Sequence, residues 1–108
     1  DYMYVDDHVN AYLLAMEKEE ANGHVFNVGT GVGISNKELA EKIAEKIGYD
    51  KRKIVFGAYP LGYPYRPQVS DQPYIVLDST KIKTKLGWKP STSLNEGLNK
   101  VISYFRGT

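Results

Sequence analysis

The stretch Lys85-Leu86-Gly87-Trp88-Lys89-Pro90 separates the last two predicted helices of this 108-residue chain. Ser79 is placed to cap the shorter helix, which carries Ile82 and ends at Gly87. Serine can accept a free amide at a helix start, and glycine permits the left-handed turn that follows a helix end. Trp88 comes directly after this turn, and we expect its large apolar ring system to pack between the two helices.

The final helix has a start signal and an apolar face. Ser93 and Glu96 have the spacing of a capping box, in which each side chain satisfies a free amide near the helix start. The apolar residues that follow recur at intervals of three and four, the period of one helical face. The predicted buried side comprises Leu94, Leu98, Val101, Ile102 and Phe105.

Two further helices are predicted nearer the N-terminus. Ser35 and Glu38 form another capping box, and Gly48 marks the end of that helix. The first helix is expected to begin at Asp6 or Asp7, either of which can cap it. Its apolar residues follow a helical period and are predicted to form a buried face: Val9, Tyr12, Leu13 and Met16.

Short segments with strand character alternate with these helices. The opening residues 1–5 are strand-like, and His24–Val28, Lys53–Phe56 and Tyr74–Leu77 are predicted strands. Residues 59–72 contain three prolines, which lack the amide of a central strand, so this segment is predicted to be an ordered loop. Short strands alternating with about four helices predict an α/β fold with a short mixed sheet.

The composition argues against several classes of function. The formal net charge is +1, and no basic stripe suited to nucleic acid is present. The absence of cysteine excludes disulfides and thiolate metal sites. No apolar run approaches the ~20 residues of a membrane span. His8 and His24 have no acidic cluster nearby, so no metal site is predicted. We therefore expect a cytoplasmic protein that binds neither nucleic acid nor a membrane.

A glycine-rich turn, Val28-Gly29-Thr30-Gly31-Val32-Gly33, lies between a predicted strand and a predicted helix. Dinucleotide-binding turns occupy such positions, because glycine lets the backbone approach a pyrophosphate at a helix start. The spacing here is G-x-G-x-G, however, and Ser35 and Glu38 already serve the helix start. The pattern favours a structural turn over a phosphate cradle.

Four motifs follow one another along the chain: Asp1–Asp7, Val25–Gly31, Arg66–Pro73 with Leu77–Lys81, and Leu86–Pro90 with Leu94–Leu98. Together they resemble the C-terminal portion of the extended short-chain dehydrogenase/reductase family, the NAD(P)-dependent nucleotide-sugar epimerases and dehydratases. The resemblance implies that residues 1–108 form the C-terminal substrate-binding segment of an extended Rossmann-type enzyme.

The same resemblance implies what lies elsewhere in such an enzyme. An N-terminal Rossmann domain would hold NAD or NADP and a catalytic Tyr-x-x-x-Lys pair; Tyr49 and Lys53 have that spacing but lie in a predicted turn. No catalytic or cofactor-binding residue is therefore predicted in this chain, and alone it is expected to be inactive and free of cofactor. The expected partners are a nucleotide-diphosphate sugar and the Rossmann domain. Without that domain, exposed apolar surface predicts self-association.

The resemblance also points to the proline-rich loop as the substrate site. An arginine of the family meets the substrate diphosphate near Arg66, whose guanidinium offers a planar fork of donors to phosphate oxygens. The spacing from Arg66 to Asp71 is longer than in the family motif, so the motif can be aligned about two residues further along the loop. Gln68 is therefore also a candidate substrate-binding residue. Asp71 is either a ribose or base ligand or a turn residue. Tyr65, with Tyr63, either lines the sugar pocket or packs the loop onto the fold.

Two other functions fit the residues. One is a free-standing, non-catalytic binding module for a nucleotide or a sugar phosphate. The other is a structural or interaction domain without a small ligand. Upstream sequence with a glycine fingerprint would favour the enzyme segment over both.

Overall fold

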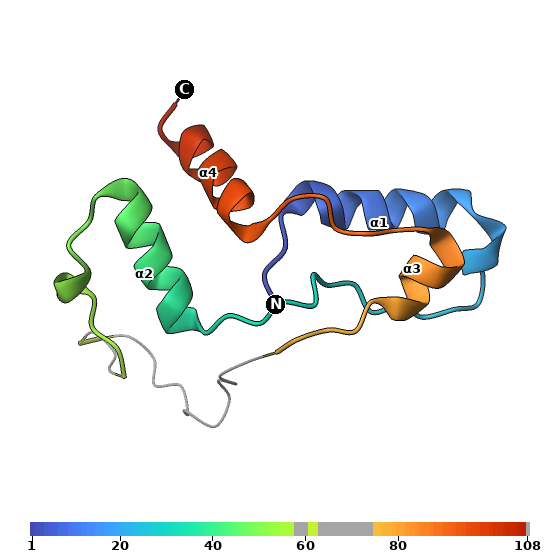
Figure 1. The fold of residues 1–108 in the computed structure, drawn as a ribbon, viewed down its shortest axis with the longest axis horizontal. Coiled ribbons are helices and arrows are strands. Elements are labelled where there is room, and N and C mark those ends of the chain that lie inside the picture. Colours follow the sequence, from blue (N-terminus) through green and yellow to red (C-terminus); the bar gives the residue numbers. More distant parts are fainter. Residues whose placement is uncertain (58–60, 63–74, 108) are drawn as a thin grey trace. The chain divides into compact units, whose positions relative to one another are not determined.

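The computed structural model describes residues 1–57, 61–62 and 75–107. Its elements are α1 (Val5–Glu17), η1 (Glu19–Ala21), α2 (Asn36–Ile47), η2 (Lys51–Lys53), α3 (Thr80–Leu86) and α4 (Leu94–Phe105), as Figure 1 shows. The chain divides into two compact units. One consists of Asp1–Gly33 together with Ile75–Thr108 and contains α1, η1, α3 and α4. The other, Ile34–Tyr74, contains α2 and η2.

The predicted mixed sheet is wrong, because residues 1–57, 61–62 and 75–107 contain helices and no β-strand. A strand exists only through a ladder of backbone hydrogen bonds to a neighbour. Within one predicted strand, the Leu77 amide donates instead to Asp1 Oδ2 at 3.2 Å. Lys53, expected to open a strand, belongs to η2. Tyr74 lies outside the described residues.

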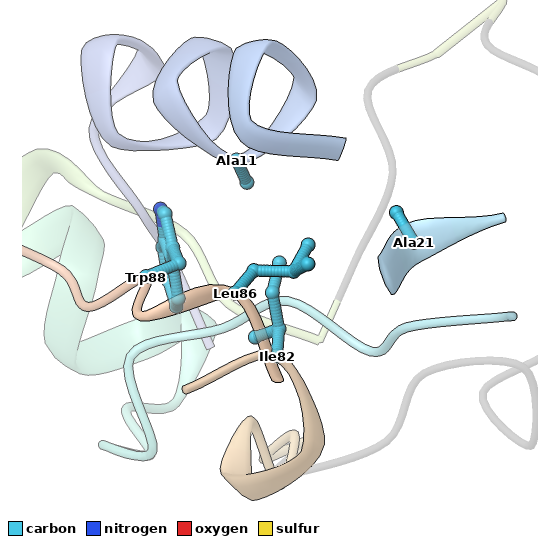
Figure 2. Close-up of a cluster of buried hydrophobic side chains, with 5 residues drawn as sticks. All are labelled: Ala11, Ala21, Ile82, Leu86 and Trp88. Carbon is cyan, nitrogen blue, oxygen red and sulfur yellow. The ribbon is translucent and has the colours of Figure 1, made fainter. Parts of the chain in front are cut away.

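A small apolar core holds the first unit together (Figure 2). It joins α1, η1 and α3 to the segment after α3 through Ala11, Ala21, Ile82, Leu86 and Trp88. Trp88 is buried, as predicted, but its cluster joins α3 to α1 and η1, where packing between the last two helices was expected. Its indole Nε1 donates to the carbonyl oxygen of Asp7 at 2.9 Å. A buried tryptophan usually needs such a partner for its N–H. Trp88 therefore fixes the start of α1 against the chain that follows α3.

The predicted buried face of α1 is wrong. Its four apolar residues are exposed, with Tyr12 at 63% and Met16 at 82%. The helix instead buries Asp7 and Ala11, while Leu14 and Ala15 pack partly against the core. Helical period shows which residues share a face, but it does not show which face has a partner. The prediction for α4 fails at Val101 and Phe105, which are exposed, while Leu94, Leu98 and Ile102 are half-buried.

The helix boundaries follow their local signals closely. Ser35 accepts from the Glu38 amide at 3.1 Å, and Ser93 accepts from the Glu96 amide at 3.2 Å, so both predicted N-caps are confirmed. Gly87, in the left-handed conformation with φ of 72°, ends α3 as predicted. The predicted cap of α1 is wrong: Tyr4 occupies the N-cap position without a side-chain hydrogen bond.

Candidate functional site

The predicted substrate-binding residues Arg66, Asp71, Tyr65 and Gln68 lie outside the residues that the structure describes, as does Tyr63. Their roles therefore stay predictions. The structure does describe the residues that follow this loop, which belong to the first unit. These residues meet the N-terminus and the glycine turn at a junction built around one carboxylate.

The Asp1 carboxylate binds donors from two separate segments. Oδ1 accepts from the Thr30 amide at 2.8 Å and from its hydroxyl at 2.7 Å. Oδ2 accepts from the Gly31 amide at 3.0 Å and from the Leu77 amide at 3.2 Å. The amino nitrogen of Asp1 also donates to the Ile75 carbonyl at 2.6 Å. Asp1 thus connects the glycine turn to the chain that leaves the predicted substrate loop.

Ser79 makes a second connection between the same two segments. Its hydroxyl accepts from the Gly29 amide at 2.8 Å and donates to the Gly29 carbonyl at 2.7 Å, and the serine is buried. Ser79 was predicted to cap α3, but its side chain makes no cap hydrogen bond. The Thr80 amide instead bonds Asp78 Oδ1 at 2.9 Å. Hydrogen bonds from Thr80 also hold the pKa of the Asp78 carboxyl below its ordinary value.

Close approach explains the glycine at position 29. A Cβ added there would lie 2.6 Å from Asp1 Oδ2 and 2.8 Å from the Leu77 Cβ, both well inside van der Waals contact. The next two amides, of Thr30 and Gly31, donate to the Asp1 carboxylate. The protein's own anion therefore occupies the amides that a phosphate would need in a nucleotide-binding turn.

An open groove of about 380 Å³ lies between α1 and the irregular segments beside it. His8 and Tyr12 of α1 line it, with their rings stacked at a centroid distance of 5.2 Å. Phe26, Asn27 and Leu77 contribute from the irregular segments. Mostly apolar walls with few polar groups suit either a ligand or a protein surface.

A second carboxylate, that of Asp7, lies in the first turn of α1. Asp7 is only 1% exposed, and its oxygens accept from the Ser91 amide and hydroxyl and from the Thr92 amide. Burial by itself would raise the pKa of the Asp7 carboxyl, but these hydrogen bonds together outweigh burial and hold the pKa below its ordinary value. Asp7 is therefore a buried, ionised anchor.

Neither carboxylate was singled out from the sequence as a structural centre. The sequence analysis assigned Asp1 only to the opening motif, and it assigned Asp7 to that motif and to a possible helix cap. Their partners are distant in sequence, so local spacing gives no signal for them. The described residues contain no group of three or more histidine, cysteine, aspartate or glutamate side chains placed to hold a metal ion. Nor does any helix described here combine the length and apolarity needed to cross a membrane.

Comparison with known proteins gives matches along nearly the whole chain. Residues 1–101 match the family model described as GDP-mannose 4,6 dehydratase. A UDP-glucose 4-epimerase of Mycolicibacterium smegmatis is 37% identical over 98% of the chain, which covers 31% of that protein. A dTDP-4-dehydro-6-deoxyglucose reductase of Escherichia coli is 33% identical over 98% of the chain, which covers 30% of that protein.

A solved structure matches as well. The crystal structure of a UDP-glucose 4-epimerase from Thermotoga maritima with UDP-glucose is 45% identical in sequence, with a TM-score of 0.77. The match covers 99% of this chain and 31% of the crystallised one. The chain thus spans less than a third of the length of the proteins that it matches.

Proposed function

This chain belongs to the GDP-mannose 4,6 dehydratase family, and from that premise we propose that it supplies the nucleotide-sugar diphosphate site of an NAD(P)-dependent epimerase or dehydratase. Relatives with epimerase and reductase names confirm the resemblance drawn from the four motifs. The observation that carries the proposal is the match to an epimerase structure that holds UDP-glucose, at 45% identity over 99% of the chain.

Arg66 is the proposed diphosphate ligand. A guanidinium presents parallel N–H donors to two phosphate oxygens and keeps its charge at all physiological pH values. Asp71 and Tyr65 are proposed to contact the nucleoside or sugar, with Gln68 as the neighbouring polar group. The first described residue after this segment is Ile75, whose carbonyl oxygen accepts a hydrogen bond from the amino nitrogen of Asp1.

The exposed side of α1 supports a larger protein around this segment. Tyr12 and Met16 are exposed apolar residues of α1, and the open groove that Tyr12 lines is also lined by Phe26 and Leu77. Contiguous apolar surface of this kind marks an interaction site. We propose that an upstream Rossmann domain, carrying NAD or NADP and the catalytic tyrosine, covers this face and contributes the chemistry.

Titration of the full-length protein with UDP-glucose by calorimetry tests the proposal. Arg66→Ala should weaken binding roughly tenfold to a hundredfold, since a charge-assisted contact contributes about 1.5–3 kcal/mol. Arg66→Lys should recover only part of the affinity, because an ammonium keeps the charge but lacks the planar fork. NAD affinity should stay nearly unchanged in both variants.

Arg52→Ala is the matched control for loss of one positive charge. Arg52 is an exposed arginine of η2 that pairs with Asp50 of its own turn. Gln68→Ala and Asp71→Ala test the register of the loop. If Arg66→Ala binds UDP-glucose normally while Gln68→Ala or Asp71→Ala binds it more weakly, the diphosphate contact is made by a residue other than Arg66. If all three variants bind it normally, this loop is not part of the substrate site.

A further inference from the structure

We propose that Asn22 is a site of spontaneous covalent modification, at which deamidation converts the asparagine to isoaspartate or aspartate. Asn22-Gly23 is the single Asn-Gly dipeptide of the sequence. It lies in an exposed turn between η1 and the segment that carries Phe26. The inference is independent of the proposed function, because it concerns the chemistry of this turn and not the substrate site.

The turn has the backbone geometry of a type II turn. Asn22 has φ of −60° and ψ of 127°, and Gly23 has φ of 77°. The His24 amide donates to the Ala21 carbonyl at 3.1 Å and closes the turn. A positive φ at the third position strains any residue with a side chain. The turn itself therefore favours glycine after Asn22, and glycine leaves its own amide nitrogen uncrowded.

Both groups that would react are accessible. Asn22 and Gly23 are exposed, and no atom lies within 4 Å of the position that a Gly23 Cβ would occupy. Among the residues that the structure describes, none accepts a hydrogen bond from the Gly23 amide. Rotation about ψ of Asn22 brings this amide nitrogen to Cγ and opens the bond from His24 to Ala21. The reaction is intramolecular, so the two groups need no further partner to meet.

The chemistry needs only water. The Gly23 amide nitrogen loses its proton and attacks Asn22 Cγ, so that an N–Cγ bond forms, the Cγ–Nδ2 bond breaks and ammonia leaves. The product is a cyclic imide. Water then adds to one of its two carbonyls: opening at the main-chain carbonyl gives isoaspartate, and opening at Cγ gives aspartate.

Isoaspartate would change the path of the main chain between two core contacts. Ala21 belongs to the buried cluster, and Phe26 packs against that cluster on the other side of the turn. In isoaspartate the main chain runs through Cβ and Cγ, which lengthens it by one atom between these residues. We therefore expect the modification to loosen Phe26 from the core and to lower the unfolding midpoint.

Incubation of the full-length protein at neutral and alkaline pH, followed by proteolysis and mass spectrometry, tests the proposal. The peptide with Asn22 should gain the mass difference between OH and NH₂, faster at higher pH because the amide must lose its proton. Asn27 is the matched internal control, since it is exposed in an irregular segment but precedes Val28. Asn22 should react at least about tenfold faster, because the branched valine crowds the attacking amide.

Asn22→Gln is the control variant, because its longer side chain would have to close a larger and slower-forming ring. An isoaspartate-specific methyltransferase should label the incubated native protein but not this variant, and only the native protein should lose thermal stability with time. If Asn22 stays intact in the folded protein while it reacts in the denatured protein, the folded turn prevents the attack and the proposal is overturned. Equal rates at Asn22 and Asn27 overturn it as well, since Gly23 would then give no advantage.

Discussion

The buried Asp7 carboxylate accepts two hydrogen bonds from Ser91, one from its amide at 3.1 Å and one from its hydroxyl at 2.8 Å, across 84 positions of sequence. Thr92 adds a third bond from its amide at 3.0 Å. The carbonyl of Asp7 also accepts the indole N–H of Trp88. A single residue of α1 therefore holds the whole segment that leads into α4.

Asp7→Asn should destabilise the 108-residue chain by about 2 kcal/mol. The variant replaces one acceptor oxygen with a donor group, and hydrogen bonds to charged groups contribute about 1.5–3 kcal/mol. Denaturant unfolding followed by the fluorescence of the single tryptophan, Trp88, measures the change. Asp6→Asn, at an exposed position one residue earlier, is the control and should stay within about 0.5 kcal/mol. Equal destabilisation by both variants would contradict the anchoring role.

Acid should weaken the fold partly through the same carboxyl. The pKa of Asp7 is lower in the folded chain than in the unfolded chain, so the unfolded chain binds more protons as pH falls. Its contribution is complete above the unfolded pKa of about 3.9 and is lost as pH falls through the folded value. Unfolding midpoints between pH 7 and pH 3 should therefore fall more steeply for the native chain than for Asp7→Asn. Parallel curves would show that Asp7 does not titrate as described.

Leu86→Ala should cost about 2–5 kcal/mol, because the side chain is 1% exposed and its removal leaves a cavity among Ala11, Ile82 and Trp88. Ile82→Val, which removes one methyl group, should cost about 0.5–1.5 kcal/mol. Lys85→Ala lies on the exposed side of α3 and should change stability little. Thermal unfolding followed by circular dichroism gives the three values. Similar midpoints for Leu86→Ala and Lys85→Ala would mean that this cluster is not the core.

Local signals predicted the caps of α2 and α4 and the end of α3, although the side-chain caps predicted for α1 and α3 were wrong. The caps at Ser35 and Ser93 and the stop at Gly87 depend on contacts within about one helical turn, so a short window of sequence contains all the partners. The burial of Trp88 also followed from its chemistry. These predictions needed no knowledge of what the rest of the chain does.

Predictions that required a distant partner failed or were never made. Asp7 was assigned to a cap, although its partners lie more than 80 positions away. The strand predictions were wrong because strand character in a short segment does not supply the neighbouring strand that a ladder needs; the Leu77 amide, for example, donates to the Asp1 carboxylate. For the site, the motifs identified the family, but the roles of Arg66 and its neighbours rest on resemblance alone.

Gly29→Ala should destabilise the chain by about 1–3 kcal/mol, the usual cost of overpacking. The new methyl would lie 2.6 Å from Asp1 Oδ2, which is held by hydrogen bonds and cannot move freely. Gly97→Ala is the instructive comparison: its nearest neighbour is the Tyr4 Cβ at 3.2 Å, and α4 gains about 1 kcal/mol of helix propensity. Calorimetric unfolding should show a clear loss for the first variant and little change for the second. The reverse order would contradict the close packing at the Asp1 junction.

The 108-residue chain alone should self-associate through the exposed side of α1. Met16 is 82% exposed and Val9 is 46% exposed, and their spacing of seven residues puts both on the same side of the helix. Water-exposed apolar surface of this extent favours association, because burying it releases about 25 cal/mol per Å². Light scattering over a range of concentrations should show a rising mass, and the double variant Val9→Glu/Met16→Glu should return the chain to a monomer. Val55→Glu, also an exposed valine at 75% but in the other unit, should leave the association unchanged. The prediction is contradicted if the native chain stays monomeric at high concentration. It is also contradicted if the double variant associates as strongly as the native chain, because this face of α1 would then not drive self-association.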